Sequence, residues 1–475
     1  MCSTSAGFLS SLFGDGGGKA ANAQSLDLPL AGFESVDTDA TVKDGAAPSI
    51  ESTKLENGAT IVSKDVAGPN CTIGVYVDAG TVNETIANAG VTRLLEAAAF
   101  RSTTSRSHFR IVRESEAIGA YLGHTSERET MVYSVQCLKT HVAEATELLL
   151  DCTLNPKFNS WEVNETAKNL MERLDDARKN PDLLISEAMN TTAFSGGLAN
   201  NVVVSNNAIS RLTVDDCADF VAKNFTGPRV VLAGAGASHN ELRAVAAPLM
   251  AGLSAEAGAT APASTYTGGD WRCEAEGPTH VSLGFSAGGG WSSIKRSTLF
   301  VVMQFLMGGG LSFSTGGPGK GMYSRLYMRA LNRYAWLQNC TFFGQHFKDH
   351  GVVGISTTVH DPSMAPEAIA VAVTELKELA KGSTTKPELE RAKKATISGI
   401  VMNMEHVHTV SEDMGRQQIA YGKHYSLEDT IKEIDSLTLK DVSAAATEML
   451  KTPLTMASYG DLAYIPRYEE VAKQF

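Results

Sequence analysis

The stretch Ile209-Ser-Arg-Leu-Thr-Val-Asp-Asp216 recurs later in the chain as Ile434-Asp-Ser-Leu-Thr-Leu-Lys-Asp441. In each copy an aspartate stands three residues after a threonine, which is the layout of a helix capping box with Asp in place of Glu. Two further pairs of landmarks keep the same offset of 225 residues: Pro228 with Pro453, and Lys168 with Lys393. A period this long indicates duplicated domains, because solenoid repeats are only ~20–50 residues long.

The duplication predicts how the chain is divided. Its 475 residues exceed the ~250–300 at which a single hydrophobic core stops growing. Residues 249–269 are rich in Ala, Gly, Ser and Thr and are typical of a linker. We therefore predict one domain at 50–248 and another at 270–475. Residues 1–49 contain no arginine, unlike cleavable targeting segments, and are expected to form a flexible or partner-draped N-terminal arm.

Alternating apolar patterns predict the fold class. Each half opens with an alternating strand, at 72–78 and 280–286, and closes with another, at 229–233 and 454–458. Helical patterns lie between them. We expect an α+β protein with two homologous domains, each a mainly antiparallel sheet covered by helices on one face.

Composition narrows the functional classes. The 53 acidic and 41 basic residues give a net charge of −12, which disfavours a nucleic-acid binder and suits a protein that attracts cationic ligands. The best apolar run, Leu299 to Leu311, is shorter than the ~20 residues of a bilayer span, so we expect membrane contact only through partners. Seven scattered cysteines without a CxxC pair favour free thiols in a reducing compartment.

Arg93, Glu96 and Ala97 take the positions of a metal-binding motif. They fall at i, i+3 and i+4 on one face of an expected helix, the spacing of H-x-x-E-H, in which two histidines bind zinc and the glutamate is the general base. A guanidinium cannot give up its proton to donate a lone pair, and an alanine side chain has none. We therefore expect no metal and no catalytic residue in this chain, with Glu96 a structural or partly exposed carboxylate.

His346 and His350 have the same i, i+4 spacing with an acid between them. They lie between two strand-like runs, with Gly351 at the corner, so they would not share a helix face. We expect a hairpin turn with solvated histidines in preference to a metal site.

Residues 308–321 contain seven glycines. The segment does not match the phosphate-binding pattern G-x-x-x-x-G-K-[ST], which would need glycine at Ser314 and a hydroxyl at Gly321. Glycine is entropically costly, and a glycine-rich backbone can lie closely against an extended peptide or swing. From composition alone, a plain flexible linker is an equally open interpretation.

Both segments resemble the M16 metallopeptidase family, and within it the alpha-type subunits of processing peptidases. The resemblance covers roughly residues 50–475 and is carried by Gly316-Gly-Pro-Gly-Lys-Gly-Met-Tyr-Ser-Arg-Leu-Tyr327 with Leu331-Asn-Arg333, and by the element from Gly90 through Leu95-Glu96 to Ala99-Phe100. It implies the two similar domains of the M16/LuxS-like fold, which the internal duplication indicates independently. In active members a further glutamate ligand lies on the helix that contains Trp161 to Ala177 here, where Glu172 is the nearest candidate.

The resemblance implies a catalytically silent subunit that binds mitochondrial presequence peptides and guides them to the zinc of a beta subunit (core 1-like). It implies no cofactor in this chain and a mitochondrial matrix location. The implied substrate-binding residues are Gly308, Gly309, Gly310, Gly316, Gly317, Pro318, Gly319, Lys320 and Gly321. Presequences are basic and amphipathic, so an acidic chamber would raise their local concentration.

Related core proteins lie on the matrix face of the inner membrane in the cytochrome bc1 complex (complex III). The resemblance therefore also implies cytochrome b and cytochrome c1 as partners, and a chain that serves both as a processing subunit and as a core subunit. Two alternatives stay open: a purely structural core 2 subunit, and a metallopeptidase active on its own, which Arg93 and Ala97 oppose. The glycine-rich segment is eroded in animal-type core proteins and intact here, which favours the processing subunit.

Overall fold

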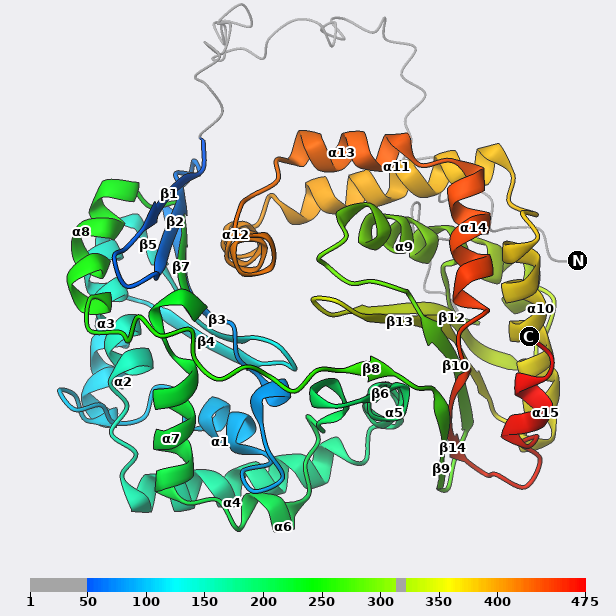
Figure 1. Cartoon of the computed structure of the whole chain (residues 1–475), viewed down its shortest axis with the longest axis horizontal. Coiled ribbons are helices and arrows are strands. Elements are labelled where there is room, and N and C mark those ends of the chain that lie inside the picture. The colour runs from blue at the N-terminus through cyan, green and yellow to red at the C-terminus, as the bar shows by residue number, and fades with distance from the viewer. Residues whose placement is uncertain (1–48, 313–321) are drawn as a thin grey trace, which may run out of the picture. The chain divides into compact units, whose positions relative to one another are not determined.

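The computed structural model describes residues 49–312 and 322–475 (Figure 1). The expected N-terminal arm up to residue 48 and positions 316–321 of the glycine-rich segment lie outside the described residues. The described chain contains two six-stranded sheets, one in each half of the sequence. This is the α+β architecture with two similar parts that the sequence predicted.

The first sheet has the strand order β1-β2-β7-β3-β5-β4. All its pairings are antiparallel except that of β2 with β7. The elements of this half are β1 Glu51–Lys54, β2 Thr60–Lys64, β3 Asn70–Val77, α1 Val91–Ala97, α2 His108–Ala117, β4 Tyr121–Ser126, β5 Met131–Leu138, α3 Val142–Leu154, α4 Ser160–Ala177, α5 Pro181–Ala193, β6 Phe194–Ser195, α6 Asn206–Ile209, α7 Val214–Asn224, β7 Val230–Ala235 and α8 His239–Met250.

The second sheet has the strand order β11-β12-β13-β10-β14-β9, and only β9 and β14 are parallel. The short strand β8 Thr265–Tyr266 precedes it and pairs with β6. The elements of this half are β9 Gly269–Glu274, β10 Thr279–Ser286, α9 Ile294–Met307, β11 Gly309–Leu311, β12 Leu337–His346, β13 Gly351–Val359, α10 Ala365–Ala380, α11 Lys386–Asn403, α12 Val407–Tyr421, α13 Leu427–Ser436, α14 Leu439–Met449, β14 Thr455–Gly460 and α15 Tyr468–Ala472.

The two capping boxes form as predicted. The Thr213 N–H donates to Asp216 Oδ2 at 2.8 Å, and the Asp216 N–H donates to Thr213 Oγ1 at 3.3 Å. Thr438 and Asp441 repeat both bonds at the same distances. These boxes start α7 and α14, and each helix is followed by the closing strand of its sheet, β7 or β14. The 225-residue offset is therefore a structural repeat.

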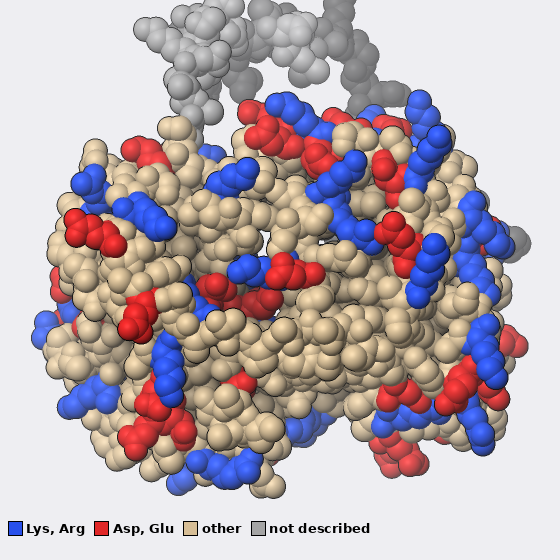
Figure 2. Space-filling model, in the orientation of Figure 1, with Lys and Arg blue, Asp and Glu red and all other residues tan. Residues whose placement is uncertain are grey.

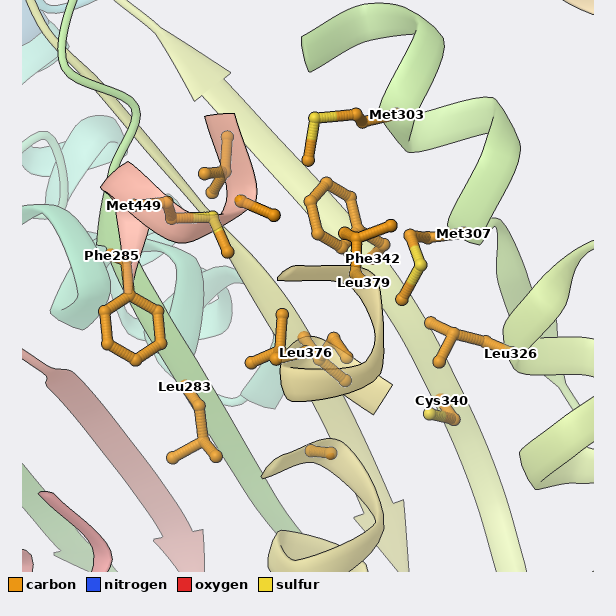
Figure 3. Close-up of a cluster of buried hydrophobic side chains, with 14 of the residues drawn as sticks. Leu283, Phe285, Met303, Met307, Leu326, Cys340, Phe342, Leu376, Leu379 and Met449 are labelled. Atoms are coloured by element: carbon orange, nitrogen blue, oxygen red, sulfur yellow. The ribbon is translucent and has the colours of Figure 1, made fainter. Parts of the chain in front are cut away.

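Each sheet packs one face on helices of its own half. In the second half, β10 and β12 pack beneath α9, α10 and α14, and Figure 3 shows their buried side chains pointing toward one another. The residues labelled there are Leu283, Phe285, Met303, Met307, Leu326, Cys340, Phe342, Leu376, Leu379 and Met449. Within the described ranges, no helix has both the length and the apolar character that a bilayer span requires.

The opposite face of each sheet is covered by a helix from the other half. α5 packs on β9, β10 and β14, and α12 packs on β3 and β7 (Figure 1). α5 follows α4, and α12 follows α11, so the two helices occupy equivalent places in the repeat. The sequence predicted helices on one face; this exchange adds a helix to the other.

The closest packing in this exchange joins α12 to β3. A Cβ built on Gly415 would lie 2.3 Å from Cδ2 of Tyr76, whose side chain is fully buried. The Tyr76 hydroxyl lies 3.4 Å from Ser411 Oγ, which donates to the carbonyl oxygen of Ala233 at 3.1 Å. Any side chain at position 415 would therefore push α12 away from the first sheet.

We predict that Gly415→Ala lowers the free energy of unfolding by about 1–3 kcal/mol, because overpacking forces the helix and the ring apart. Gly399→Ala in α11 is the matched control, since its Cβ would lie 3.5 Å from Phe305 Cζ, an ordinary contact. Gly399→Ala should raise stability by up to about 1 kcal/mol, the helix-propensity gain. Urea denaturation of both variants checks this, and equal effects would contradict the packing account.

Candidate functional site

Helix α1 carries the degenerate metal motif, and a buried carboxylate fixes its start. Glu84 accepts hydrogen bonds from the backbone N–H groups of Gly90 at 2.8 Å and Thr92 at 2.9 Å. An anion at a helix N-terminus satisfies free N–H donors and interacts well with the helix dipole. Gly90 itself has a φ of 92°, and a Cβ there would lie 2.8 Å from Ile209 Cδ1. The helix is therefore held firmly although it carries no metal-binding histidine.

Arg93 and Glu96 form an ion pair along one face of α1. The Arg93 guanidinium also donates to the backbone oxygen of Ser126 at 3.3 Å. Burial raises the pKa of Glu96, and the charge of Arg93 is the strongest opposing influence. The side chains of both residues are only about one-fifth exposed (23% and 20%). Glu96 is thus a paired carboxylate, and the Arg93 guanidinium supplies the positive charge beside it.

Arg173 on α4 brings a second guanidinium to the same place. Its charge opposes the raised pKa of Glu96 and, with the charge of Arg93, adds to burial in lowering the pKa of His124 on β4. Glu172, the third-ligand candidate named from the sequence, is exposed and is not among the main influences on Glu96. Arg173 is also exposed, and among the α4 residues its charge is the one that acts on Glu96. Two basic side chains stand here, and neither can ligate a metal.

A search of residues 49–312 and 322–475 finds no group of three or more His, Cys, Asp or Glu side chains placed to hold a metal ion. The donor chemistry at Arg93, Glu96, Ala97 and Arg173 does not fit zinc, which needs three or four N, S or O ligands. No step of a hydrolytic reaction can therefore be assigned to this motif.

His346 and His350 lie in the β12–β13 hairpin, as the sequence predicted. His346, however, is not solvated. His346 ends β12 and its ring lies against Trp291 and Phe300, with centroid distances of 5.3 and 6.2 Å. Neither ring nitrogen has a hydrogen-bond partner among the described residues. Burial lowers the pKa of His346 to about 4. The expectation of solvated histidines is wrong for His346, because aromatic residues from α9 and the loop before it cover the ring.

The first three predicted glycines form the base of the glycine-rich segment. Gly308 ends α9 with a φ of 57°, and a Cβ there would lie 2.4 Å from Cβ of Ser324. A Cβ on Gly309 would lie 1.9 Å from the Cys340 carbonyl oxygen. Gly309 and Gly310 open β11, the edge strand of the second sheet. Close approach to β12 and to Ser324 therefore requires glycine at positions 308 and 309.

Ser324 and Arg325, which sequence analysis did not single out, anchor the far end of this segment. The Gly309 N–H donates to Ser324 Oγ at 3.1 Å, so the two ends of the segment are joined. Arg325 is buried, and its guanidinium donates to Ser383 Oγ at 2.7 Å and pairs with Glu388 at 3.5 Å. A buried arginine with hydroxyl and carboxylate partners is a costly feature that favours a fixed position. The glycine-rich segment thus leaves and re-enters the fold at one closed point.

Among the described residues, the degenerate motif and the base of the glycine-rich segment belong to different halves of the fold. α1 packs against α4, α7 and β4 in the first half, whereas β11 lies at the edge of the second sheet. The remaining predicted substrate-binding residues lie outside the described residues: Gly316, Gly317, Pro318, Gly319, Lys320 and Gly321.

We predict that Arg93→His, Ala97→His and Arg173→Glu together create a zinc site, because they place two imidazoles at i, i+4 on α1 and one carboxylate on the neighbouring helix α4. The isolated variant should retain about one zinc ion per chain after dialysis, as measured by elemental analysis. The double variant Arg93→His with Ala97→His is the control and should lose its zinc. Equal retention by both variants would show that Arg173 does not occupy a ligand position.

His346 predicts a pH effect on stability. Its folded-state pKa of about 4 lies below the ordinary 6.5, so the unfolded chain binds the proton more readily over this interval. The free energy of unfolding should therefore fall as the pH is lowered from 6.5 toward 4. His346→Phe should reduce this fall, and His360→Gln, at an exposed position, should leave it unchanged. Urea denaturation near neutral pH and at about pH 5 checks this, and an unchanged fall in His346→Phe would contradict it.

Comparison with known proteins agrees with this geometry. Residues 60–205 match the family model for insulinase (peptidase family M16), and residues 211–396 match the model for the peptidase M16 inactive domain. The chain is 42% identical to the mitochondrial-processing peptidase subunit alpha of Solanum tuberosum, over 95% of this chain and 89% of the relative. It is 29% identical to the human cytochrome b-c1 complex subunit 2, over 90% of this chain and 94% of the relative.

A chain in the structure of complex III2 from Candida albicans, bound to Inz-5, has the same fold. The TM-score is 0.76 at 18% identity, over 89% of this chain and 99% of that chain. Family models, curated relatives and structure agree with the resemblance seen in the sequence. The chain belongs to the M16 peptidase family.

Proposed function

We propose that this chain is the non-catalytic alpha subunit of a mitochondrial processing peptidase. The observation that carries the proposal is the ion pair of Arg93 with Glu96, in a chain that keeps the M16 fold. The 42% identity to a plant alpha subunit over nearly the whole chain supports the same assignment. Cleavage is then performed by a beta subunit that binds zinc, and this chain needs no cofactor of its own.

The role of the glycine-rich segment is to bind the presequence. Its described base is closed by the Gly309–Ser324 hydrogen bond and anchored by Arg325. Leu311 and Tyr323 flank it with large exposed apolar surfaces, 65% and 76% exposed. Such side chains suit the apolar face of an amphipathic peptide, and glycine backbone allows close approach. Lys320 and Pro318 belong to the same proposed contact set.

The proposed location is the mitochondrial matrix. The plant and human relatives carry mitochondrial names, which supports this placement. On the same grounds the chain acts on mitochondrial presequence peptides and pairs with a beta subunit.

A second role is favoured by one specific observation, the similarity to the human cytochrome b-c1 complex subunit 2. We propose that the chain also serves as a core subunit of complex III, at the matrix face of the inner membrane. Its partners would then include cytochrome b and cytochrome c1. The shared fold with a complex III chain from Candida albicans is compatible with this role.

We predict that deletion of Gly316–Gly321 weakens precursor processing, because the substrate loses its contact with this chain. The kcat/KM of the purified alpha–beta pair on a presequence peptide should fall about tenfold or more, equivalent to about 1.4 kcal/mol. Assembly of the pair, followed by size-exclusion chromatography, should be retained. Unchanged kinetics in an assembled pair would remove the proposed role of the segment.

Glu96→Gln is the matched control for that deletion. This change is isosteric and would abolish catalysis if Glu96 were a general base. In this chain it should leave kcat/KM within about twofold of the unmodified pair.

Purification in mild detergent tests the second role, because a complex III subunit should bring cytochrome b and haem with it.

A further inference from the structure

A cavity of about 940 Å³ lies between the two halves, away from the degenerate motif and the glycine-rich base. Its volume is in the range of small-ligand sites, roughly 300–1,000 Å³. The walls come from α5 and the β4–β5 turn of the first half, and from α9, α12 and the β12–β13 hairpin of the second. In Figure 2 the surface is hollowed near its middle, where acidic and basic side chains gather.

Most of the cavity wall is apolar. Side chains from α5, α9, α11 and α12 and the adjoining loops contribute, among them Leu183, Val202, Ile294, Val301, Met404 and Met414. A wall of this kind favours a ligand with an apolar chain, because the ligand removes that surface from water.

One end of the cavity is polar, and three segments meet there. Arg128 of the β4–β5 turn pairs with Glu187 of α5 at 2.8 Å, and both side chains are about 90% buried. The Gln345 amide of β12 donates to Ser186 Oγ of α5 at 2.6 Å. The Lys348 N–H of the hairpin donates to the Glu129 carboxylate at 2.7 Å. These bonds place α5, the β4–β5 turn and the hairpin around the same end.

This end has an excess of carboxylates. Lys348 Nζ lies 3.9 Å from Asp78 Oδ2. The positive charge of Lys348 lowers the pKa of Glu129, and the negative charge of Asp349 raises it. Asp78 and Glu129 therefore share the Lys348 ammonium group, whereas Arg128 pairs with Glu187 at 2.8 Å and Arg416 pairs with Glu127 of the same turn at 2.7 Å. Burial, together with the charges of Asp78 and Asp349, raises the pKa of Glu129 to about 7. Lys64 also lines the cavity, but it lies at the end of β2. Because β2 is three positions from β5 in the strand order, Lys64 does not belong to this group of charges beside the β4–β5 turn.

The polar groups that lack partners here include two hydrogen-bond acceptors. Asn190 is only 2% exposed, and its Oδ1 has no partner among the described residues. Its Nδ2 donates to the carbonyl oxygen of Ser186 at 2.9 Å, which fixes the amide orientation because a carbonyl only accepts. Asn190 shares the cavity-lining face of α5 with Leu183, Ser186 and Glu187. Gln345 Oε1 likewise has no hydrogen-bond partner in residues 49–312 and 322–475.

We propose that this end of the cavity binds a guanidinium or primary ammonium group carried on an apolar chain. The cation donates hydrogen bonds to Asn190 Oδ1, Gln345 Oε1 and the Glu129 carboxylate, and the apolar chain lies along the wall. A primary ammonium has three N–H donors and a guanidinium has five N–H bonds, so either can satisfy these acceptors. A buried acceptor left unpaired costs free energy that such a ligand recovers. The site lies within this chain and stands independently of the proposed processing role.

The test uses the full chain without any partner and n-octylguanidinium as the probe, with isothermal titration calorimetry as the readout. We expect n-octylguanidinium to bind about tenfold or more tightly than n-octanol, and octanoate to bind more weakly still. Glu129→Gln should weaken n-octylguanidinium binding about tenfold, whereas Glu469→Gln, on the exposed surface of α15, should not. Equal binding of cation and alcohol, or unchanged binding to Glu129→Gln, would overturn the proposal.

Asn190→Leu is a second variant, and its thermal unfolding is followed in parallel because the position is buried. A folded Asn190→Leu chain with undiminished affinity for n-octylguanidinium would also overturn the proposal.

A competition experiment then distinguishes the source of the cation. An apolar decapeptide with one arginine should displace n-octylguanidinium if the natural ligand is a polypeptide segment, whereas failure to compete limits the supported ligand to small organic cations.

Discussion

The packing of α12 on the first sheet and of α5 on the second is the constraint on which the rest of the molecule depends. Gly415 lets α12 rest on the Tyr76 ring, and Gly284 of β10 approaches Met189 of α5 closely enough that a Cβ would lie 2.4 Å from its Cε. Neither sheet is complete without a helix from the other half. The two halves therefore form one body, with an open cavity between them. Close-packed interiors transmit small changes in volume, so the Tyr76 ring makes glycine at position 415 a requirement of the fold.

The degenerate motif shows how an M16 chain keeps its scaffold without a metal. Glu84 still caps α1, and the helix still presents Glu96 beside α4. The charge that a zinc ion would supply comes from Arg93 and Arg173, which hold down the pKa of Glu96 against its burial. The nearby guanidinium charges keep the electrostatic balance, since an unpaired buried carboxylate would be costly.

Much of the fold was accessible from the sequence because its signals are local. Thr213 and Thr438 cap helices through residues three positions away, and the strands follow their alternating pattern. The exchanged helices, the aromatic cover of His346 and the contact of Gly309 with Ser324 depend on segments far apart in the chain, which no local pattern reveals. Glu172 and Arg173 are adjacent in α4, and one residue turns a helix by about 100°, so the spacing of the motif alone does not identify the α4 residue nearest to it.

The central claim is that guanidinium groups have taken the place of a metal in this chain, so that any cleavage belongs to a partner. The most direct measurement is the zinc content of the purified chain and of its complex with the beta subunit, by elemental analysis after dialysis. The account predicts essentially no zinc in the chain alone and about one zinc ion per alpha–beta pair. Tightly held zinc at about one ion per isolated chain would contradict it.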